Sequence, residues 1–288
     1  MSDFPLPAGG RVAVAVQAPG VGPQNWAGAS SAALDDDGSF VVAYRVRVRA
    51  EDVAATVVAR SDDGENLTTV ATLDKARFGA MSMERPALVR TETGRWRLYV
   101  CSATPNSKHW WIDLLEADDP VGFADAETRP VFPGDESMGV KDPVIRYAGG
   151  VWHAWICCHP LDTADEEDRM TTAYATSDDG VDWTWHGTVL APRPGRWDAR
   201  GARVSAVLPD GRAAYDGRAT KDENWFERTG LAGPAAEPGR LVQTNDAPAT
   251  HIRYLDVVSL PGGGYRLYYE APLHDESHEL RTELITPC

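Results

Sequence analysis

The chain has 288 residues, of which 43% are hydrophobic and ten are tryptophan, and its formal net charge is −15. This charge disfavours binding to nucleic acid and to anionic lipid, because both are themselves negative. No apolar run reaches the roughly 20 residues of a membrane span, and the first residues lack the basic and apolar regions of a secretory signal, so we expect a cytoplasmic protein without membrane contact.

The predicted elements begin after a short polar arm, residues 1–10. Residues 11–17 alternate between apolar and polar positions and read as a strand. From residue 28 onward, short strands joined by glycine turns recur along the chain. The turn glycines are separated by 56, 56, 61 and 52 residues, and they are Gly38, Gly94, Gly150, Gly211 and Gly263.

The third of these hairpins, residues 139–158, is the clearest. A β-branched run is followed by Gly149 and Gly150, which suit a tight turn, and then by a second apolar run. Further strands are marked by Ser-Asp-Asp-Gly at 61–64 and 177–180, where Asp-Gly favours a turn. The acidic loop 161–169 is expected to be solvated.

Four strands in each of five units of about fifty residues are typical of a β-propeller, whose blades stack around a central channel. We therefore predict an all-β fold, a single five-bladed propeller over residues 1–288. The blades are placed at about 28–75, 84–133, 141–192, 201–243 and 251–285, with residues 11–17 closing the ring by joining the last blade.

The cysteines show neither Cys-x-x-Cys spacing nor histidine partners at zinc-site distances. Cys157 and Cys158 are adjacent and should point to opposite faces of one strand. We expect Cys101, Cys157, Cys158 and Cys288 to be reduced core residues. The sequence therefore predicts no metal site and no cofactor, with a calcium ion in the channel as an open alternative.

Charged side chains cluster where the innermost strand of each blade should begin, beside the channel. Four of the five predicted blades supply such charge, whereas a purely structural barrel would have apolar residues there. The residues that should face the channel are Asn25, Trp26, Ser30, Glu84, Arg85, Lys141, Asp142, Asp198, Arg200, Arg203, His251, Arg253 and Asp256.

These segments resemble the five-bladed propeller glycosidases of glycoside hydrolase families 43, 32 and 130. The similarity rests on Met-Glu-Arg-Pro-Ala-Leu at 83–88, Val-Lys-Asp-Pro-Val-Ile at 140–145, the two Ser-Asp-Asp-Gly boxes, Tyr-Asp-Gly at 215–217 and Tyr-Tyr-Glu-Ala at 268–271. It extends over about residues 25–275. The resemblance implies a glycoside hydrolase acting on a small or oligomeric neutral glycan.

In such enzymes one carboxyl group protonates the glycosidic oxygen and another activates water or phosphate. Glu84 resembles the acid of family 43, Asp142 resembles the aspartate of its Asp-Pro motif, and Asp256 or Asp198 is the third carboxylate. We expect an inverting hydrolase, in which the acid and base are about 6.5–9.5 Å apart. A general acid also needs a raised pKa, which we expect for Glu84.

The sequence also departs from these families. Small residues, 27–30, stand where families 43 and 32 carry a catalytic aspartate, and Arg85 replaces the aspartate of family 130. Asp216 replaces a histidine that helps to hold phosphate in family 130. Phosphorolysis is thereby disfavoured, although Lys141, Arg203, Arg253 and His251 could still form an anion pocket.

Several alternatives remain open. The charged pairs could be ion pairs that only line the channel, His251 could be structural, and Trp26, Trp110 and Trp111 could be core residues rather than sugar platforms. The protein could also be a family-130-like phosphorylase or a non-catalytic sugar-binding propeller. The predicted substrate-binding residues are Trp26, Asn25, Arg85, Lys141, Asp198, Arg203, His251 and Arg253; the sequence does not indicate an oligomeric state.

Overall fold

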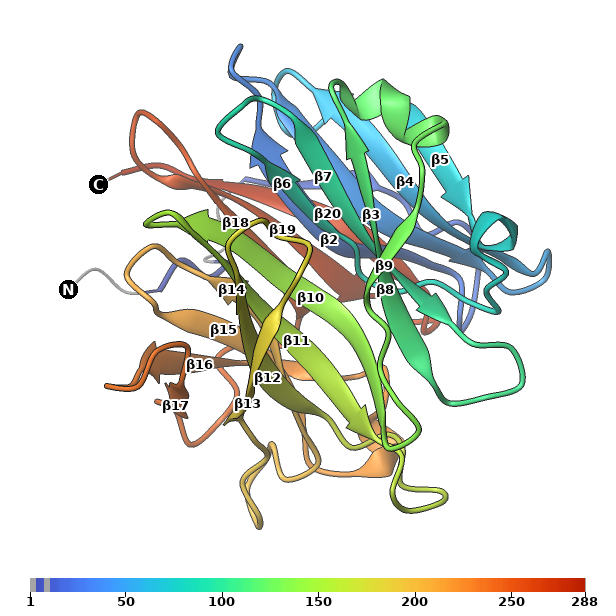
Figure 1. Cartoon of the computed structure of the whole chain (residues 1–288), viewed down its shortest axis with the longest axis vertical. Coiled ribbons are helices and arrows are strands. Elements are labelled where there is room, and N and C mark those ends of the chain that lie inside the picture. The colour runs from blue at the N-terminus through green and yellow to red at the C-terminus, as the bar shows by residue number, and fades with distance from the viewer. Residues whose placement is uncertain (1–3, 8–10, 288) are drawn as a thin grey trace.

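The computed structural model describes residues 4–7 and 11–287, and strands dominate this part of the chain (Figure 1). Helical structure within the described residues is limited to short 3-10 turns, which are η1 (Lys75–Phe78), η2 (Pro120–Ala124) and η3 (Lys221–Glu223). No helix among the described residues is long and apolar enough to cross a membrane.

Three sheets contain four antiparallel strands each, in simple up-and-down order. The first contains β6 (Ala87–Arg90), β7 (Trp96–Ala103), β8 (Trp110–Ala117) and β9 (Arg129–Phe132). The second contains β10 (Met138–Ala148), β11 (Val151–Pro160), β12 (Thr171–Ser177) and β13 (Thr184–Leu190). The third contains β14 (Gly201–Val207), β15 (Ala213–Arg218), β16 (Arg228–Pro234) and β17 (Leu241–Gln243).

An eight-stranded sheet joins the start of the chain to its end. One half contains β2 (Trp26–Leu34), β3 (Phe40–Val48), β4 (Val53–Ser61) and β5 (Thr68–Asp74), and the other contains β18 (Arg253–Ser259), β19 (Tyr265–Pro272), β20 (His278–Ile285) and β1 (Val12–Val16). A parallel bridge between Trp26 and His278 connects the halves. The two halves lie side by side in blue and red (Figure 1). We interpret them as two separate blades.

The predicted all-β class and its four-stranded antiparallel sheets are confirmed. The expected closing strand is also present, because β1 pairs antiparallel with β20 from Val12↔Glu283 to Val16↔Leu280. Gly149 and Gly150 form the expected turn, with φ of 60° and 82°. The number of blades and the division into one domain remain predictions.

The hydrophobic core lies between neighbouring sheets rather than within any one of them. Tyr99 and Phe132 pack with Trp152 and Ile156 of the next sheet in one cluster. Buried Cys101, Cys157 and Cys158 are free thiols, as expected, whereas Cys288 lies outside the described residues. This packing fixes the sheets relative to one another, and with them the strand starts that carry the charged side chains.

The inner strands β2, β10, β14 and β18 each contain a register shift against their neighbour. Within three of these irregularities a non-glycine residue takes the left-handed conformation: Ala29 (φ 51°), Asp142 (φ 50°) and Tyr254 (φ 50°). A β-bulge bends its strand and re-aims a side chain. The bulges thus set the direction of Asp142 and Tyr254 beside the site.

Candidate functional site

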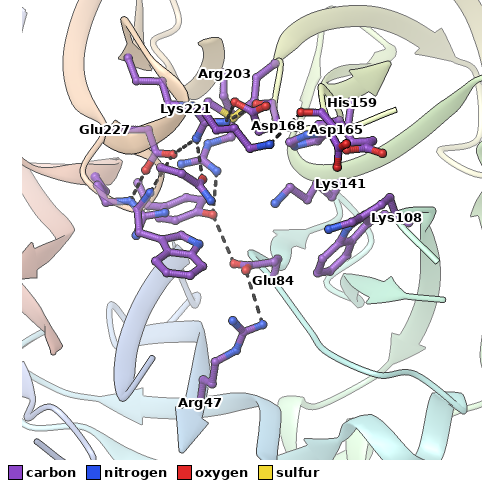
Figure 2. Close-up of a pocket in the computed structure, with 18 residues that line it drawn as sticks. Arg47, Glu84, Lys108, Lys141, His159, Asp165, Asp168, Arg203, Lys221 and Glu227 are labelled. Atoms are coloured by element: carbon purple, nitrogen blue, oxygen red, sulfur yellow. Dashed lines mark hydrogen bonds and ion pairs between the residues drawn. The ribbon is translucent and has the colours of Figure 1, made fainter. Parts of the chain in front are cut away.

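A cavity of about 300 Å³ lies where the inner strands β10, β14 and β18 begin, next to the segment before β6. Charged side chains from several sheets converge on it (Figure 2). The labelled Glu84, Arg47, Lys141 and Lys108 surround open space there (Figure 2). Such convergence at the mouth of a propeller channel is the arrangement predicted from the sequence.

Glu84 is the carboxylate most fully surrounded by positive charge. It forms an ion pair with Arg45, and its other oxygen lies 3.8 Å from an Arg47 nitrogen. Burial alone would raise the pKa of Glu84, but Arg45, Lys141 and Arg47 outweigh burial and hold the pKa well below its ordinary value. The expected raised pKa is therefore wrong, because the sequence did not show that arginines of β3 reach this carboxylate.

Arg45 lies fully buried on β3 and joins two carboxylates, since its second terminal nitrogen binds Glu270 on β19. Gly28 makes this possible: a Cβ at this position would collide with the Glu270 side chain. Gly28, among the small residues at 27–30, therefore provides space for a carboxylate from another strand.

Tyr254 links two of the three carboxylates that the sequence predicted to be catalytic, Glu84 and Asp142. Its hydroxyl oxygen lies 3.3 Å from Glu84 Oε2 and 3.3 Å from Asp142 Oδ2. Those two carboxylate oxygens are thus separated by no more than twice that distance. Glu84 lines the cavity, but Asp142 is fully buried behind Tyr254 and Arg203.

Arg203 is held in place by two buried aspartates. It donates to Asp142 at 2.9 Å and to Asp216 at 2.8 Å, and it also donates to the Tyr254 oxygen at 2.7 Å. Burial raises the pKa of Asp216, against the opposing effect of Arg203. The aspartate in the Tyr-Asp-Gly motif therefore binds an arginine of the protein itself.

Glu227 is a second cavity carboxylate, and the sequence did not single it out. It pairs with Arg218, and it lies 2.7 Å from Arg253 Nε. Burial alone would raise the pKa of Glu227, but Arg253 and Arg218 outweigh it and lower the pKa. Arg253 also binds Glu270 at 2.9 Å. Its charge is therefore shared between two carboxylates.

Some predicted residues lie away from this cavity. Asp198 is fully buried and accepts hydrogen bonds from Arg193 at 2.9 Å and from Tyr215 at 2.8 Å. Asn25 donates to the Val21 carbonyl at 2.8 Å and so shapes a loop. Neither side chain lines the cavity, and their role in binding substrate stays a prediction.

His251 is exposed and does not line the cavity. Asp256 and Arg85 line a separate cavity of about 300 Å³, farther along the inner strands, and they lie 3.5 Å apart. The structure therefore does not bring Asp256 together with Glu84. The predicted anion pocket loses His251 but keeps Lys141, Arg203 and Arg253.

Trp26 is a core residue rather than a wall of the cavity. Only 1% of its surface is exposed, and it stacks on His278 with ring centroids 5.2 Å apart. Arg45 lies 5.0 Å from its ring centroid. Trp110 and Trp225 line the cavity instead, and the Lys141 ammonium lies 4.8 Å from the Trp110 ring.

The acidic loop 161–169 also contributes to the cavity, contrary to the expectation that it is merely solvated. Asp165, Glu167 and Asp168 line the cavity together with His159 at the end of β11. No spacing in the sequence indicates that this loop folds back over the strand starts. Among the described residues, no three His, Cys, Asp or Glu side chains are grouped so as to hold a metal ion.

No protein-family model and no curated protein matches this sequence. Solved structures do match its fold over nearly the whole chain. One belongs to the GH130 family of mannoside phosphorylases, described as containing glycoside hydrolases that target β-1,2-mannosidic linkages in Candida mannan; identity is 16%, the TM-score is 0.65, and 96% of each chain is covered.

Two further structures support the same comparison. The β-1,2-mannobiose phosphorylase of Listeria innocua, solved with β-1,2-mannobiose, is 14% identical with a TM-score of 0.63, covering 98% of this chain and 93% of that one. Fructan 1-exohydrolase IIa of Cichorium intybus is 13% identical with a TM-score of 0.64, and the match covers 95% of this chain and 57% of that one. The predicted resemblance to propeller glycosidases is confirmed at the level of the fold.

Proposed function

We propose that this protein cleaves a glycosidic bond in a small neutral glycan by hydrolysis, with Glu84 facing the reacting sugar. The observation that carries the proposal is the position of Glu84 on the wall of a cavity of about 300 Å³, where it is paired with Arg45. The shared fold of glycan-acting enzymes supports the same class of reaction.

Glu84 suits the role of base or charge stabiliser better than that of acid. Glycoside cleavage passes through a transition state with positive charge on the sugar ring, which an adjacent carboxylate stabilises. A carboxylate with a lowered pKa is ionised at neutral pH, which suits the stabilising role, and the same shift makes it a weaker base toward water. If it activates water directly, a single displacement occurs and the anomeric configuration inverts.

Three other carboxylates of the cavity have pKa values shifted in the same direction as that of Glu84. The pKa of Glu227, Asp168 and Glu167 is lowered, as is that of Glu84. A preformed general acid would instead have a raised pKa. The proposed reaction should consequently be fastest with leaving groups that need little protonation, such as nitrophenolate.

Hydrolysis is favoured over phosphorolysis because the arginines of the cavity are already paired with carboxylates. Arg203 is paired with Asp142 and Asp216, and Arg253 is paired with Glu227 and Glu270. A phosphate ion would have to compete with these buried carboxylates for the same donors. Neutral substrate and water face no such competition.

Phosphorolysis is the second candidate. Lys108 and Lys141 line the cavity and could attract phosphate, and two of the structural neighbours belong to phosphorylase families. A cytoplasmic location is proposed for either activity. The free thiols of Cys101, Cys157 and Cys158 support it, since a reducing compartment keeps thiols unpaired.

The test is turnover of nitrophenyl mannosides, arabinosides, xylosides and galactosides, with and without phosphate. If the reaction is hydrolysis, free sugar should form at a rate that phosphate does not change. NMR of the first product formed should show an anomeric configuration opposite to that of the substrate. Glu84→Gln should lower kcat at least about 1000-fold, whereas Glu237→Gln, at an exposed ion pair with Arg240, should retain wild-type rates. Phosphate-dependent release of sugar phosphate would support the second candidate. Glycan binding without turnover would identify a non-catalytic propeller.

A further inference from the structure

His159 is a buried side chain in the cavity that the proposed chemistry does not yet use. It lies near the end of β11, opposite Gly139 of β10, and only 8% of its surface is exposed. Its Nδ1 lies 2.7 Å from the backbone carbonyl oxygen of Glu167. Its Nε2 is buried and has no hydrogen-bond partner among the described residues.

The Glu167 carbonyl determines where the imidazole carries its proton. A carbonyl oxygen can only accept a hydrogen bond, so His159 Nδ1 must be the donor. In a neutral imidazole the other nitrogen is then an unprotonated acceptor. Burial and the charges of Lys141, Arg218 and Arg203 lower the pKa of His159 well below its ordinary value, which keeps the ring neutral.

An unprotonated Nε2 is a neutral acceptor, unlike the carboxylates of Glu84, Asp165 and Glu167 that also line this cavity. The neighbouring Lys141, Arg203 and Arg218 offer only donors, and the Glu227 carboxylate is occupied by arginines. A buried polar atom without a partner has a cost, which a ligand could remove by supplying the matching group. The matching group for a bare imidazole nitrogen is a hydroxyl that donates.

We propose that His159 is a specificity-determining residue whose Nε2 accepts a hydrogen bond from one hydroxyl of the bound sugar. The inference deepens the proposed glycosidase function and rests on it. A sugar hydroxyl has a hydrogen to donate at this point, whereas phosphate dianions and carboxylates do not. The site therefore selects a neutral sugar carrying a hydroxyl at one particular ring position.

Two variants separate this role from a structural one. His159→Asn keeps a donor near the Nδ1 position for the Glu167 carbonyl but removes the Nε2 acceptor. His159→Gln keeps a side-chain oxygen near the Nε2 position but loses the donor. We expect His159→Asn to lower kcat/KM about tenfold, with thermal stability close to wild type, and His159→Gln to recover part of the activity. His186→Asn, on the exposed face of β13, is the control.

Monodeoxy analogues of the best nitrophenyl glycoside identify the hydroxyl. For one analogue, wild type and His159→Asn should have the same kcat/KM, because the contact is already absent. An equal loss across all analogues would overturn the inference in favour of a structural role. So would wild-type kinetics in His159→Asn on every substrate.

A second readout does not depend on turnover. In the ligand-free protein, nitrogen NMR of labelled histidine should show His159 Nδ1 protonated and Nε2 unprotonated from pH 8 down to pH 6. A protonated Nε2 would contradict the proposal even in an active enzyme. So would a hydrogen bond from Lys141 to Nε2 that persists when the protein is saturated with methyl glycoside. Absence of turnover with the expected tautomer would instead count against the glycosidase function.

Discussion

The hydroxyl oxygen of Tyr254 lies 3.3 Å from the carboxylate of Glu84, and it is also 3.3 Å from the buried Asp142. One phenol therefore connects the cavity carboxylate to the charged groups behind it. Tyr254 owes this position to a left-handed backbone, with φ of 50°, at the bulge of β18. Glu84 is thus oriented by partners on both sides, Arg45 and Tyr254.

Replacing Tyr254 with phenylalanine should weaken catalysis without removing the fold. Hydrogen bonds to charged groups contribute about 1.5–3 kcal/mol, so we expect kcat/KM on the best nitrophenyl glycoside to fall roughly 10- to 100-fold. Tyr265→Phe, at the far end of β19, should have little effect. Unchanged kinetics in Tyr254→Phe would mean that the link to Glu84 has no catalytic role.

Arg45→Met should destabilise the protein by about 3–5 kcal/mol, because Glu84 and Glu270 would both lose a buried partner. The free energy of unfolding in urea measures this change. Adding Glu270→Gln to Arg45→Met should recover part of the loss, since one uncompensated charge disappears. Equal stability of wild type and Arg45→Met would contradict the assigned ion pairs.

Gly28→Ala should cost about 1–3 kcal/mol of unfolding free energy, because the new methyl group would collide with the Glu270 side chain. Gly262→Ala is the matched control: it lies in a turn, and a Cβ there would meet nothing within 4 Å. Chemical denaturation of both variants provides the comparison. Similar stabilities would show that Glu270 can move away without loss.

Stability should decrease as the pH falls. The native pKa of Glu270 is about 2, because Arg45 and Arg253 outweigh the effect of burial, whereas an unfolded glutamate has a pKa of about 4.3. Its stabilisation is therefore complete above about pH 5 and is lost as the pH falls toward 2, in total of the order of a few kcal/mol.

Buried His278 and His159 add to the same slope. Burial lowers the pKa of both below the ordinary value of 6.5, so unfolding takes up protons there from about pH 6.5 downward. Urea unfolding at pH 7, 5 and 3.5 should show a progressive decrease, smaller in Glu270→Gln. A flat profile would count against these pKa shifts.

The repeat of turn glycines was sufficient to predict the strands and the pairing of residues 11–17 with the end of the chain. It also brought Glu84, Lys141, Asp142, Arg203 and Arg253 together, because strand starts are close to one another in any radial arrangement of sheets. The sequence therefore predicted correctly those residues whose place in space follows from their place in the repeat.

The remaining site residues have no such fixed place. Arg45 lies on β3 and Glu270 on β19, and Glu270 can approach Arg45 because Gly28 leaves room for its side chain. Asp256 was expected at the site, but it follows the bulge of β18 and lies along the other cavity. Bulges and long-range ion pairs depend on packing between sheets, which a pattern within one segment does not encode.

The pairing of β1 with β20 has a consequence for how the molecule would respond to a mechanical load. The strands are antiparallel, with Val12 opposite Glu283, so both tails leave from the same end of the pair. Pulling on the tails would peel this pair open one hydrogen bond at a time, instead of shearing all of its bonds together. On the N-terminal side, the load would reach β1 only after the buried Phe4 had left its contacts with Ala206 and Leu208.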